Sequence, residues 1–313
     1  WLTALEHEYS ELYNTLQGWL SAPIQGFGEF GSEPHRQQLL SRRKLFTALT
    51  DAWRRVGPRD VNPDTGEYYG EAIKLDHIDL SQQLESLPEL TANFDHVSRV
   101  DLSECGLTDS VEGFLRRFHG LRSLNLELNR LTRLPQALEY MHGLEVLRLP
   151  GNRVVLDLVA VARLKKMTRL LLLDLDGNPL GLSPDISRMG RLWLLYLNNT
   201  GLPGWPTGIF AKPRPRGFRL DLNGNPITQL PDVAPGSERA QILVRTGLDR
   251  SLLPPDVLEK LKLYIESVGL DPDRVAARIK ADDVKARLRE NPEEGIARGA
   301  FCSPPQSGKR HAR

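Results

Sequence analysis

Hydrophobic residues in the middle of the chain recur with a long period that fits neither a single amphipathic helix nor an alternating strand. In one unit, Leu121, Leu124, Leu126 and Leu131 stand at the first, fourth, sixth and eleventh positions, and Asn129 stands at the ninth. Six units follow this template at intervals of 22–26 residues, and they start at Val97, Leu121, Leu144, Leu170, Leu192 and Gly217. A repeat of this length predicts a solenoid, because one unit cannot bury its own apolar face and must stack on its neighbours.

Each unit predicts a short strand, a tight turn and a looser return segment, with Leu134 and Pro135 in one such return. The slot held by Asn129 follows the strand. An amide side chain can donate to and accept from backbone groups of adjacent turns, which would otherwise be buried without partners. We therefore predict a structural ladder at this slot, formed by Cys105, Asn129, Asn152, Asn178, Thr200 and Asn225.

The template is identified as the leucine-rich repeat. This resemblance implies an α/β repeat solenoid, a horseshoe with parallel strands on its concave face, and we expect α-helical flanks at both ends. A degraded copy with Leu75, Ile78 and Leu80 precedes the six units. We assign residues 71–233 to the repeat domain.

Residues 1–70 have helical periodicity instead of the long repeat. Apolar residues line one face of a helix within residues 1–20, and Ser32 and Pro34 are suited to begin a second helix. The buried side of that second helix is expected to hold Leu39, Leu40, Leu45, Leu49 and Trp53. An uncapped solenoid would expose its leucines, so this flank is a helical cap or, alternatively, the tail of a preceding domain.

The C-terminal flank is also expected to be helical. Residues 234–298 are interpreted as a cap or as the start of a truncated domain, and Pro254 and Pro255 stand near the start of one amphipathic helix. Residues 299–313 are polar and basic, and we expect a disordered tail.

The residues beside the strand leucines are expected to line the concave face, where such solenoids bind their partners. The predicted protein-binding residues are Asp101, Asn125, Glu127, Arg148, Leu172, Asp174, Asp176, Tyr196, Asn198 and Asp221. The surface is acidic with a central Arg148, an exposed Tyr196 and an apolar strip of Val146, Leu172 and Leu194. Aromatic and apolar groups surrounded by charge are typical of protein-binding patches, and the alternative is a set of ordinary solvated strand residues.

Composition narrows the class of partner. The chain has 313 residues, a net charge of +1 and 26% charged residues, which argues against a nucleic-acid binder that works by bulk charge. The sequence has no apolar run long enough for a membrane span. Two cysteines, Cys105 and Cys302, exclude a disulfide framework and a four-thiolate zinc site. The partner is therefore expected to be another protein, and no cofactor is expected.

One stretch has the spacing of a calcium-binding loop. Asp174, Asp176 and Asn178 stand where the first three ligands would, but Pro179 replaces the required glycine and Asp185 replaces the final glutamate. Asn178 also belongs to the repeat template, so we predict no metal site.

The repeats within residues 73–270 resemble those of a family of large bacterial proteins. The segments LPELTANFDHVSRVDLSECGL and DGNPLGLSPDISRMGRLWLLYLNNTGL look similar to proteins that combine a dermonecrotic-toxin-like region with a ubiquitin-ligase domain of the NEL class. The resemblance implies the substrate-recognition region of a secreted, virulence-associated bacterial effector. Its partners would be a host protein and ubiquitin-pathway components, and its location would be the host cell cytoplasm, or otherwise the bacterial cytoplasm.

The alternative is a cysteine-dependent ubiquitin ligase whose catalytic domain is truncated or missing. The catalytic cysteine of that family lies in a Cys-x-Asp motif, whereas Cys302 is followed by Ser303 and Pro304, and Cys105 belongs to the repeats. We predict no catalytic residue, and whether the chain is an enzyme stays open. A third alternative is a structural repeat protein inside the bacterium.

Overall fold

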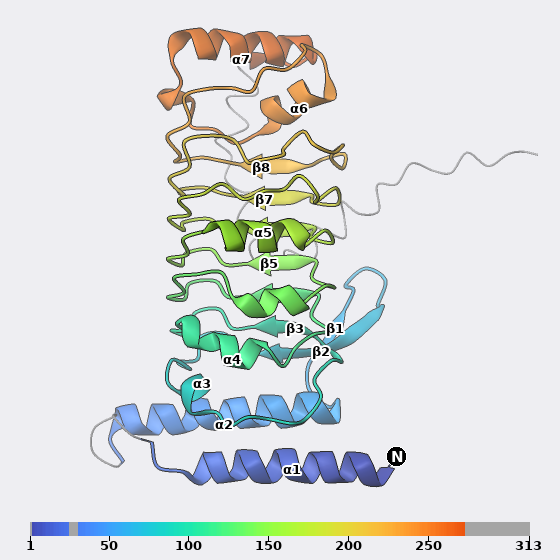
Figure 1. Cartoon of the computed structure of the whole chain (residues 1–313), viewed down its shortest axis with the longest axis vertical. Helices are drawn as coiled ribbons and strands as arrows, with labels where there is room; N and C mark the ends of the chain where they lie inside the picture. The colour runs from blue at the N-terminus through green and yellow to red at the C-terminus, as the bar shows by residue number, and fades with distance from the viewer. Residues whose placement is uncertain (1, 25–30, 273–313) are drawn as a thin grey trace, which may run out of the picture.

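The computed structural model describes residues 2–24 and 31–272, which form one elongated stack (Figure 1). Two helices lie at each end of the stack: α1 (Leu2–Ser21) and α2 (Glu33–Arg54) at one end, and α6 (Glu238–Arg245) and α7 (Pro255–Ser267) at the other. The strands of one sheet fill the space between the two pairs. This architecture confirms the predicted α/β solenoid with helices at both ends.

In the described residues the sheet has eight strands in chain order: β1 (Arg59–Val61), β2 (Tyr68–Lys74), β3 (Val97–Asp101), β4 (Ser123–Asn125), β5 (Val146–Arg148), β6 (Leu172–Asp174), β7 (Leu194–Tyr196) and β8 (Arg219–Asp221). β1 is antiparallel to β2, and every later pair is parallel. Leu124, Leu147, Leu173 and Leu195 are direct neighbours in register, and each is 0% exposed. The strand leucines therefore form one row that points inward.

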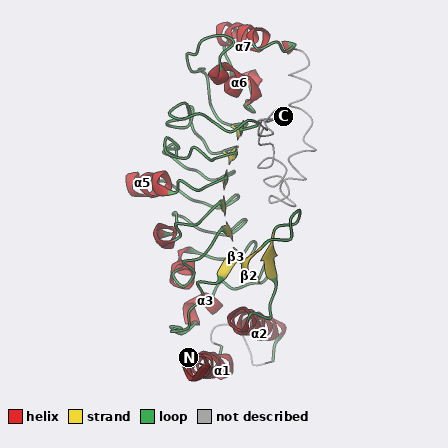
Figure 2. Cartoon of the chain, turned by 90° about the vertical axis from the view of Figure 1, so that its right-hand side faces the viewer, coloured by secondary structure: helices red, strands yellow, loops and turns green. Residues whose placement is uncertain are grey.

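The return segments run on the opposite side from the strands and carry short helices (Figure 2). These are α3 (Gln83–Ser86), η1 (Asp109–Val111), α4 (Glu112–Leu115), η2 (Gln136–Tyr140) and α5 (Leu158–Lys166), and η3 (Arg250–Leu252) lies near the C-terminal helices. The unit of 26 residues is the longest, and it holds α5. Asp157 begins this helix by accepting a hydrogen bond from the backbone N–H of Ala160 at 2.7 Å.

The N-terminal helices share the hydrophobic core of the repeats. Leu12 and Leu16 of α1 and Leu45 and Leu49 of α2 belong to one continuous cluster with the strand leucines. β2 begins at Tyr68, so the sheet already includes residues before position 71. Helices and repeats are therefore parts of one packed body at this end.

Two residues of α2 lie on the opposite side from the one expected. Leu39 and Leu40 are 37% and 49% exposed, so the prediction that they are buried is wrong. The buried face at this turn is polar instead, because Arg42 donates through Nε to Gln83 Oε1 and through Nη1 to the carbonyl of Trp19, both at 2.9 Å. The helix turns its leucines outward here so that this guanidinium can reach its acceptors.

The C-terminal helices form a hydrophobic cluster of their own, made of Val233, Ala240, Leu243, Val244, Leu253, Leu261, Tyr264 and Ile265. Trp205, Phe210 and Leu230 are half-buried and pack against both this cluster and the main core. The coil continues past β8, since Gly247 donates its N–H to the carbonyl of Leu220 at 2.9 Å. The remaining expected helical residues, the expected tail at 299–313 and Cys302 lie outside the described residues.

Candidate protein-binding site on the concave face

The ladder slot fixes the turn that follows each strand. Asn129 Nδ2 donates to the carbonyls of Leu102 and Leu126 at 2.8 and 3.0 Å, and its Oδ1 accepts from the N–H groups of Cys105 and Leu107 at 3.1 and 2.9 Å. Later repeats make corresponding bonds through Asn152, Asn178, Thr200 and Asn225. Each set joins neighbouring repeats, so the ladder holds in place the strands that carry the concave residues.

Cys105 occupies the ladder slot of the first unit as a buried free thiol. Its Sγ donates to the carbonyl of Leu75 at 2.9 Å. Burial raises the pKa of Cys105 to about 12, so the thiolate that nucleophilic chemistry requires is scarce at neutral pH. This cysteine is a structural residue.

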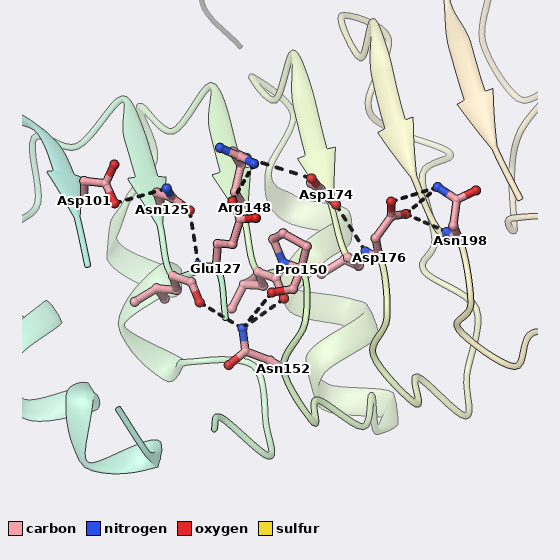
Figure 3. A network of polar contacts seen from close by, with 12 residues as sticks. Asp101, Asn125, Glu127, Arg148, Pro150, Asn152, Asp174, Asp176 and Asn198 are labelled. Atoms are coloured by element: carbon pink, nitrogen blue, oxygen red, sulfur yellow. Dashed lines mark hydrogen bonds and ion pairs between the residues drawn. The ribbon is translucent and has the colours of Figure 1, made fainter. Parts of the chain in front are cut away.

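A chain of polar contacts crosses the concave face from one strand to the next (Figure 3). Asn125 Nδ2 donates to Asp101 Oδ1 at 3.1 Å, and Asn125 Oδ1 accepts from the N–H of Glu127 at 3.1 Å. Arg148 Nη2 then donates to Glu127 Oε2 at 2.6 Å, while Arg148 Nε lies 3.8 Å from Asp174 Oδ2. The predicted residues of β3 to β6 are thus linked to one another.

The same chain continues to β8. Asp174 Oδ1 accepts from the N–H of Asp176 at 3.2 Å, and both carboxylate oxygens of Asp176 accept from Asn198 Nδ2 at 2.8 Å. Asn198 Oδ1 accepts from the N–H of Asn223 at 2.9 Å, and Asn223 Nδ2 donates to Asp221. Side chains from six successive repeats therefore share one network, which no single repeat would reveal.

Asp174 has an unusual charge state within this network. Burial, and after it the negative charge of Asp176, raise the pKa of Asp174 to about 7, although the positive charge of Arg148 opposes the shift. Two carboxylates with one guanidinium between neighbouring strands do not both ionise as easily as they would in water. The network therefore gains or loses a proton near neutral pH.

Exposure divides the predicted residues into two groups. Asp101, Asn125 and Glu127 are partly exposed. The others are only 1–6% exposed: Arg148, Leu172, Asp174, Asp176, Tyr196, Asn198 and Asp221. The expectation of an open surface is wrong for this second group. One physical reason is that side chains on strands about 4.8 Å apart pair with one another and leave little of each free.

The apolar strip is likewise closed. Val146, Leu172, Leu194 and Tyr196 form a buried cluster separate from the main core, and half-buried Trp193 packs against them. Tyr196 is 5% exposed, so the exposed tyrosine predicted from the sequence is wrong. Burial raises the pKa of Tyr196 to about 12, and its hydroxyl has no hydrogen-bond partner among the described residues. That Leu172 and Tyr196 contact a partner stays a prediction.

A buried acid that the sequence did not single out anchors the edge of this face. Asp60 of β1 is 1% exposed, and it accepts from Ser98 Oγ at 2.7 Å and from Arg99 Nη2 at 2.9 Å. Arg122 Nη1 lies 3.8 Å away from it, and Arg122 also pairs with Glu145 at 2.5 Å. Asp60 precedes the first repeat and belongs to no periodic pattern, so only the fold brings it to these arginines.

The described residues contain no group of three or more His, Cys, Asp or Glu side chains able to hold a metal ion. Two side chains with the calcium-like spacing have other hydrogen-bond partners: Asp176 accepts from Asn198, and Asn178 bonds to backbone groups. No helix in this part of the chain is both long and apolar enough to cross a bilayer.

Comparison with known proteins agrees with this geometry. Residues 95–154 match the family described as leucine rich repeat. The fold is a leucine-rich-repeat solenoid. No curated protein matches the sequence significantly.

Several solved leucine-rich-repeat structures are similar to the chain. The domain of a Shigella effector has 14% identity and a TM-score of 0.49, with 83% of this chain and 94% of that chain covered. An internalin of Listeria monocytogenes has 17% identity and a TM-score of 0.42, with 64% and 58% covered. The Arabidopsis receptor kinase HAESA, solved with a peptide hormone and a co-receptor, has 21% identity and a TM-score of 0.40, with 56% and 33% covered. The chain spans 20%, 49% and 58% of the first three solved chains that it matches.

Proposed function

We propose that the repeats are the substrate-recognition region of a secreted bacterial effector-like protein and bind another protein through the concave face. The observation that carries the proposal is the polar network from Asp101 to Asp221, which holds side chains of six repeats in fixed positions. A surface that is already ordered loses less side-chain entropy when a partner binds. The effector-like role, with delivery to the host cell cytoplasm, rests on the sequence resemblance of residues 73–270.

The partner is expected to meet the partly exposed end of the network first. Asp101, Asn125 and Glu127 lie there, and Arg148 holds the Glu127 carboxylate in place with a hydrogen bond of 2.6 Å. Two carboxylates beside an amide favour a partner segment that carries Lys or Arg. We therefore expect a basic segment of the partner to lie over β3 and β4.

Site-specific photo-crosslinking tests this proposal. A photoreactive phenylalanine analogue at Asn125 is expected to capture the partner, whereas the same analogue at exposed Arg43 on α2 is not. Asp101→Asn with Glu127→Gln removes both charges at nearly constant volume, and we expect the Kd of the purified partner to rise about fivefold or more. The matched control, Arg43→Gln with Lys44→Gln, should leave the Kd unchanged. Equal crosslinking at both positions with unaltered affinity would show that the concave face is not the contact surface.

The ligase alternative has no support among the described residues, because Cys105 is buried with a raised pKa. Incubation of the chain with a ubiquitin-loaded conjugating enzyme tests it directly. Thiol-dependent transfer that disappears in Cys302→Ala would replace the recognition proposal by an enzymatic one.

A further inference from the structure

Exposed cationic side chains gather on one flank of the solenoid, in the segments that lead into β6, β7 and β8. These segments lie against each other: Trp193 donates its N–H to the carbonyl of Leu171 at 2.8 Å, and Arg214 Nη1 donates to the carbonyl of Met189 at 2.7 Å. A Cβ placed on Gly190 would lie 3.4 Å from Lys212 Cδ, so this lysine lies over the preceding repeat. Cations from three repeats therefore share one surface.

We name this surface the basic flank, and it consists of Lys166, Arg169, Arg188, Arg191, Lys212 and Arg216. All six side chains are exposed. Lys166 pairs with Glu139 at 3.4 Å and Arg169 with Glu145 at 3.6 Å, and both keep more than half of their side chains exposed. The side chains of the other four, Arg188, Arg191, Lys212 and Arg216, make no hydrogen bond or ion pair with any described residue. A chain with a net charge of only +1 thus concentrates unpaired positive charge here.

The backbone that presents Lys212 and Arg216 is held rigidly. Arg214 lies between them, and its guanidinium donates to four carbonyls, those of Ile186, Met189, Gly208 and Ile209. Prolines at 213 and 215 flank it and restrict the backbone further. The arrangement turns one arginine inward as a clamp and leaves its cationic neighbours outside in fixed positions, which lowers the entropy lost when an anionic partner binds.

Three of the arginines occupy the same position in successive repeats. Arg169, Arg191 and Arg216 each stand three residues before Leu172, Leu194 and Arg219, which are neighbours in register. Adjacent strands are about 4.8 Å apart, and an α-helix rises about 5.4 Å per turn. An extended chain repeats its side chains only every ~6.7 Å. Carboxylates on one face of a helix, at i, i+4 and i+7, therefore fit this row better than those of a strand.

We propose that the basic flank is a second docking surface, and that it binds an acidic α-helix of another protein that lies across the repeats. The carboxylates of one helix face would contact Arg169, Arg191 and Arg216, and the next positions would contact Arg188 and Lys212. A nucleic acid fits less well, since proteins that track its backbone neutralise about 6–10 phosphates, and this surface holds four unpaired cations.

The test uses a fluorescein-labelled helical peptide with glutamates on one face, and an isomer of the same composition with glutamates distributed around the helix. We expect the one-faced peptide to bind more tightly, and Arg188→Glu with Arg191→Glu and Arg216→Glu to raise its Kd about tenfold or more at low salt. The matched control reverses three exposed cations of α2, as Arg36→Glu, Arg43→Glu and Lys44→Glu, and should change the Kd less than about twofold. Circular dichroism and the Tm confirm that both variants are folded.

Three outcomes would overturn the proposal: equal loss in both triple variants, equal affinity for the two peptides, or tighter binding of a single-stranded oligonucleotide of equal charge. Asp101→Asn with Glu127→Gln should leave peptide binding unchanged, because these residues lie on the concave face. This variant separates the basic flank from the proposed concave site, so either can fail without the other.

Discussion

The two halves of the solenoid differ in how their end helices are attached. The N-terminal half, from α1 to β4, has one core in which Leu16 and Leu45 pack with the strand leucines. In the C-terminal half, α6 and α7 hold a separate cluster that includes Ile265, with half-buried residues between it and the main core. A cap within the common core is expected to unfold with the repeats, whereas one with its own core can open alone.

The same halves differ on the concave side. Asp101, Asn125 and Glu127 in the first half are partly exposed, while Asp174 and Asp221 in the second half are buried. The half whose end helices share the main core thus has the more exposed concave residues. The leucine core therefore determines the stability of the solenoid. The pairing of polar side chains between neighbouring repeats determines which concave residues are exposed.

Leu45→Ala is expected to destabilise the largest part of the molecule. Leu45 is 0% exposed in the shared core, and removing a buried leucine side chain costs about 2–5 kcal/mol. We expect urea denaturation to show this loss for the whole solenoid, with faster hydrogen exchange from β1 to β8. Cys105, which is buried in the native state, should also react with an alkylating agent at lower urea.

Ile265→Ala is the matched change in the other half, since Ile265 is 1% exposed in the cluster of α6 and α7. It should lower the protection of residues 233–267 by a similar free energy of about 2–5 kcal/mol. The exchange of β3 and β4 should stay as in the wild type. If Ile265→Ala and Leu45→Ala exposed the same strands equally, the distinction between the two ends would be contradicted.

Asp60→Asn tests how much the buried contacts of the Asp60 carboxylate stabilise the N-terminal half. The carboxylate accepts from Ser98 and Arg99 inside the fold, so loss of its charge weakens the attachment of β1. Because Arg99 is partly solvated, we expect a loss of about 1–3 kcal/mol. Asp64→Asn in the exposed turn between β1 and β2 is the control, and an equal loss there would rule out the buried contacts as the cause.

Asp174→Asn tests the buried half through the pH dependence of stability. The pKa of Asp174 is raised from 3.8 to about 7 by burial, so between about pH 4 and pH 7 the native state binds more protons than the unfolded chain. Wild-type stability should therefore fall as pH rises through this window and level off above it. Melting curves from pH 5 to 8 should be flatter for Asp174→Asn. Identical profiles would mean that this carboxyl is already ionised in the fold.

The sequence was most informative where a residue obeys the repeat. The leucine row and the parallel order of the repeat strands follow from the period, because each unit must bury its leucines against the next. Leu39 and Leu40 were misplaced because the buried face of α2 carries a guanidinium instead of leucine at that turn. Asp60 and the basic flank escaped notice because their partners or neighbours come from other segments of the chain.

By itself, the sequence determined the stacking of repeats, the inward leucines and the residue types offered on each strand, since these depend on local spacing. Only the tertiary structure decided which of those side chains remain accessible. That depends on distances of a few ångströms between neighbouring repeats. Arg148 and Asp174 meet and are buried, while Arg191 and Arg216 make no ion pair within residues 2–24 and 31–272. The spacing pattern predicts which side chains lie on a face, but their contacts with neighbouring side chains determine which of them a partner can reach.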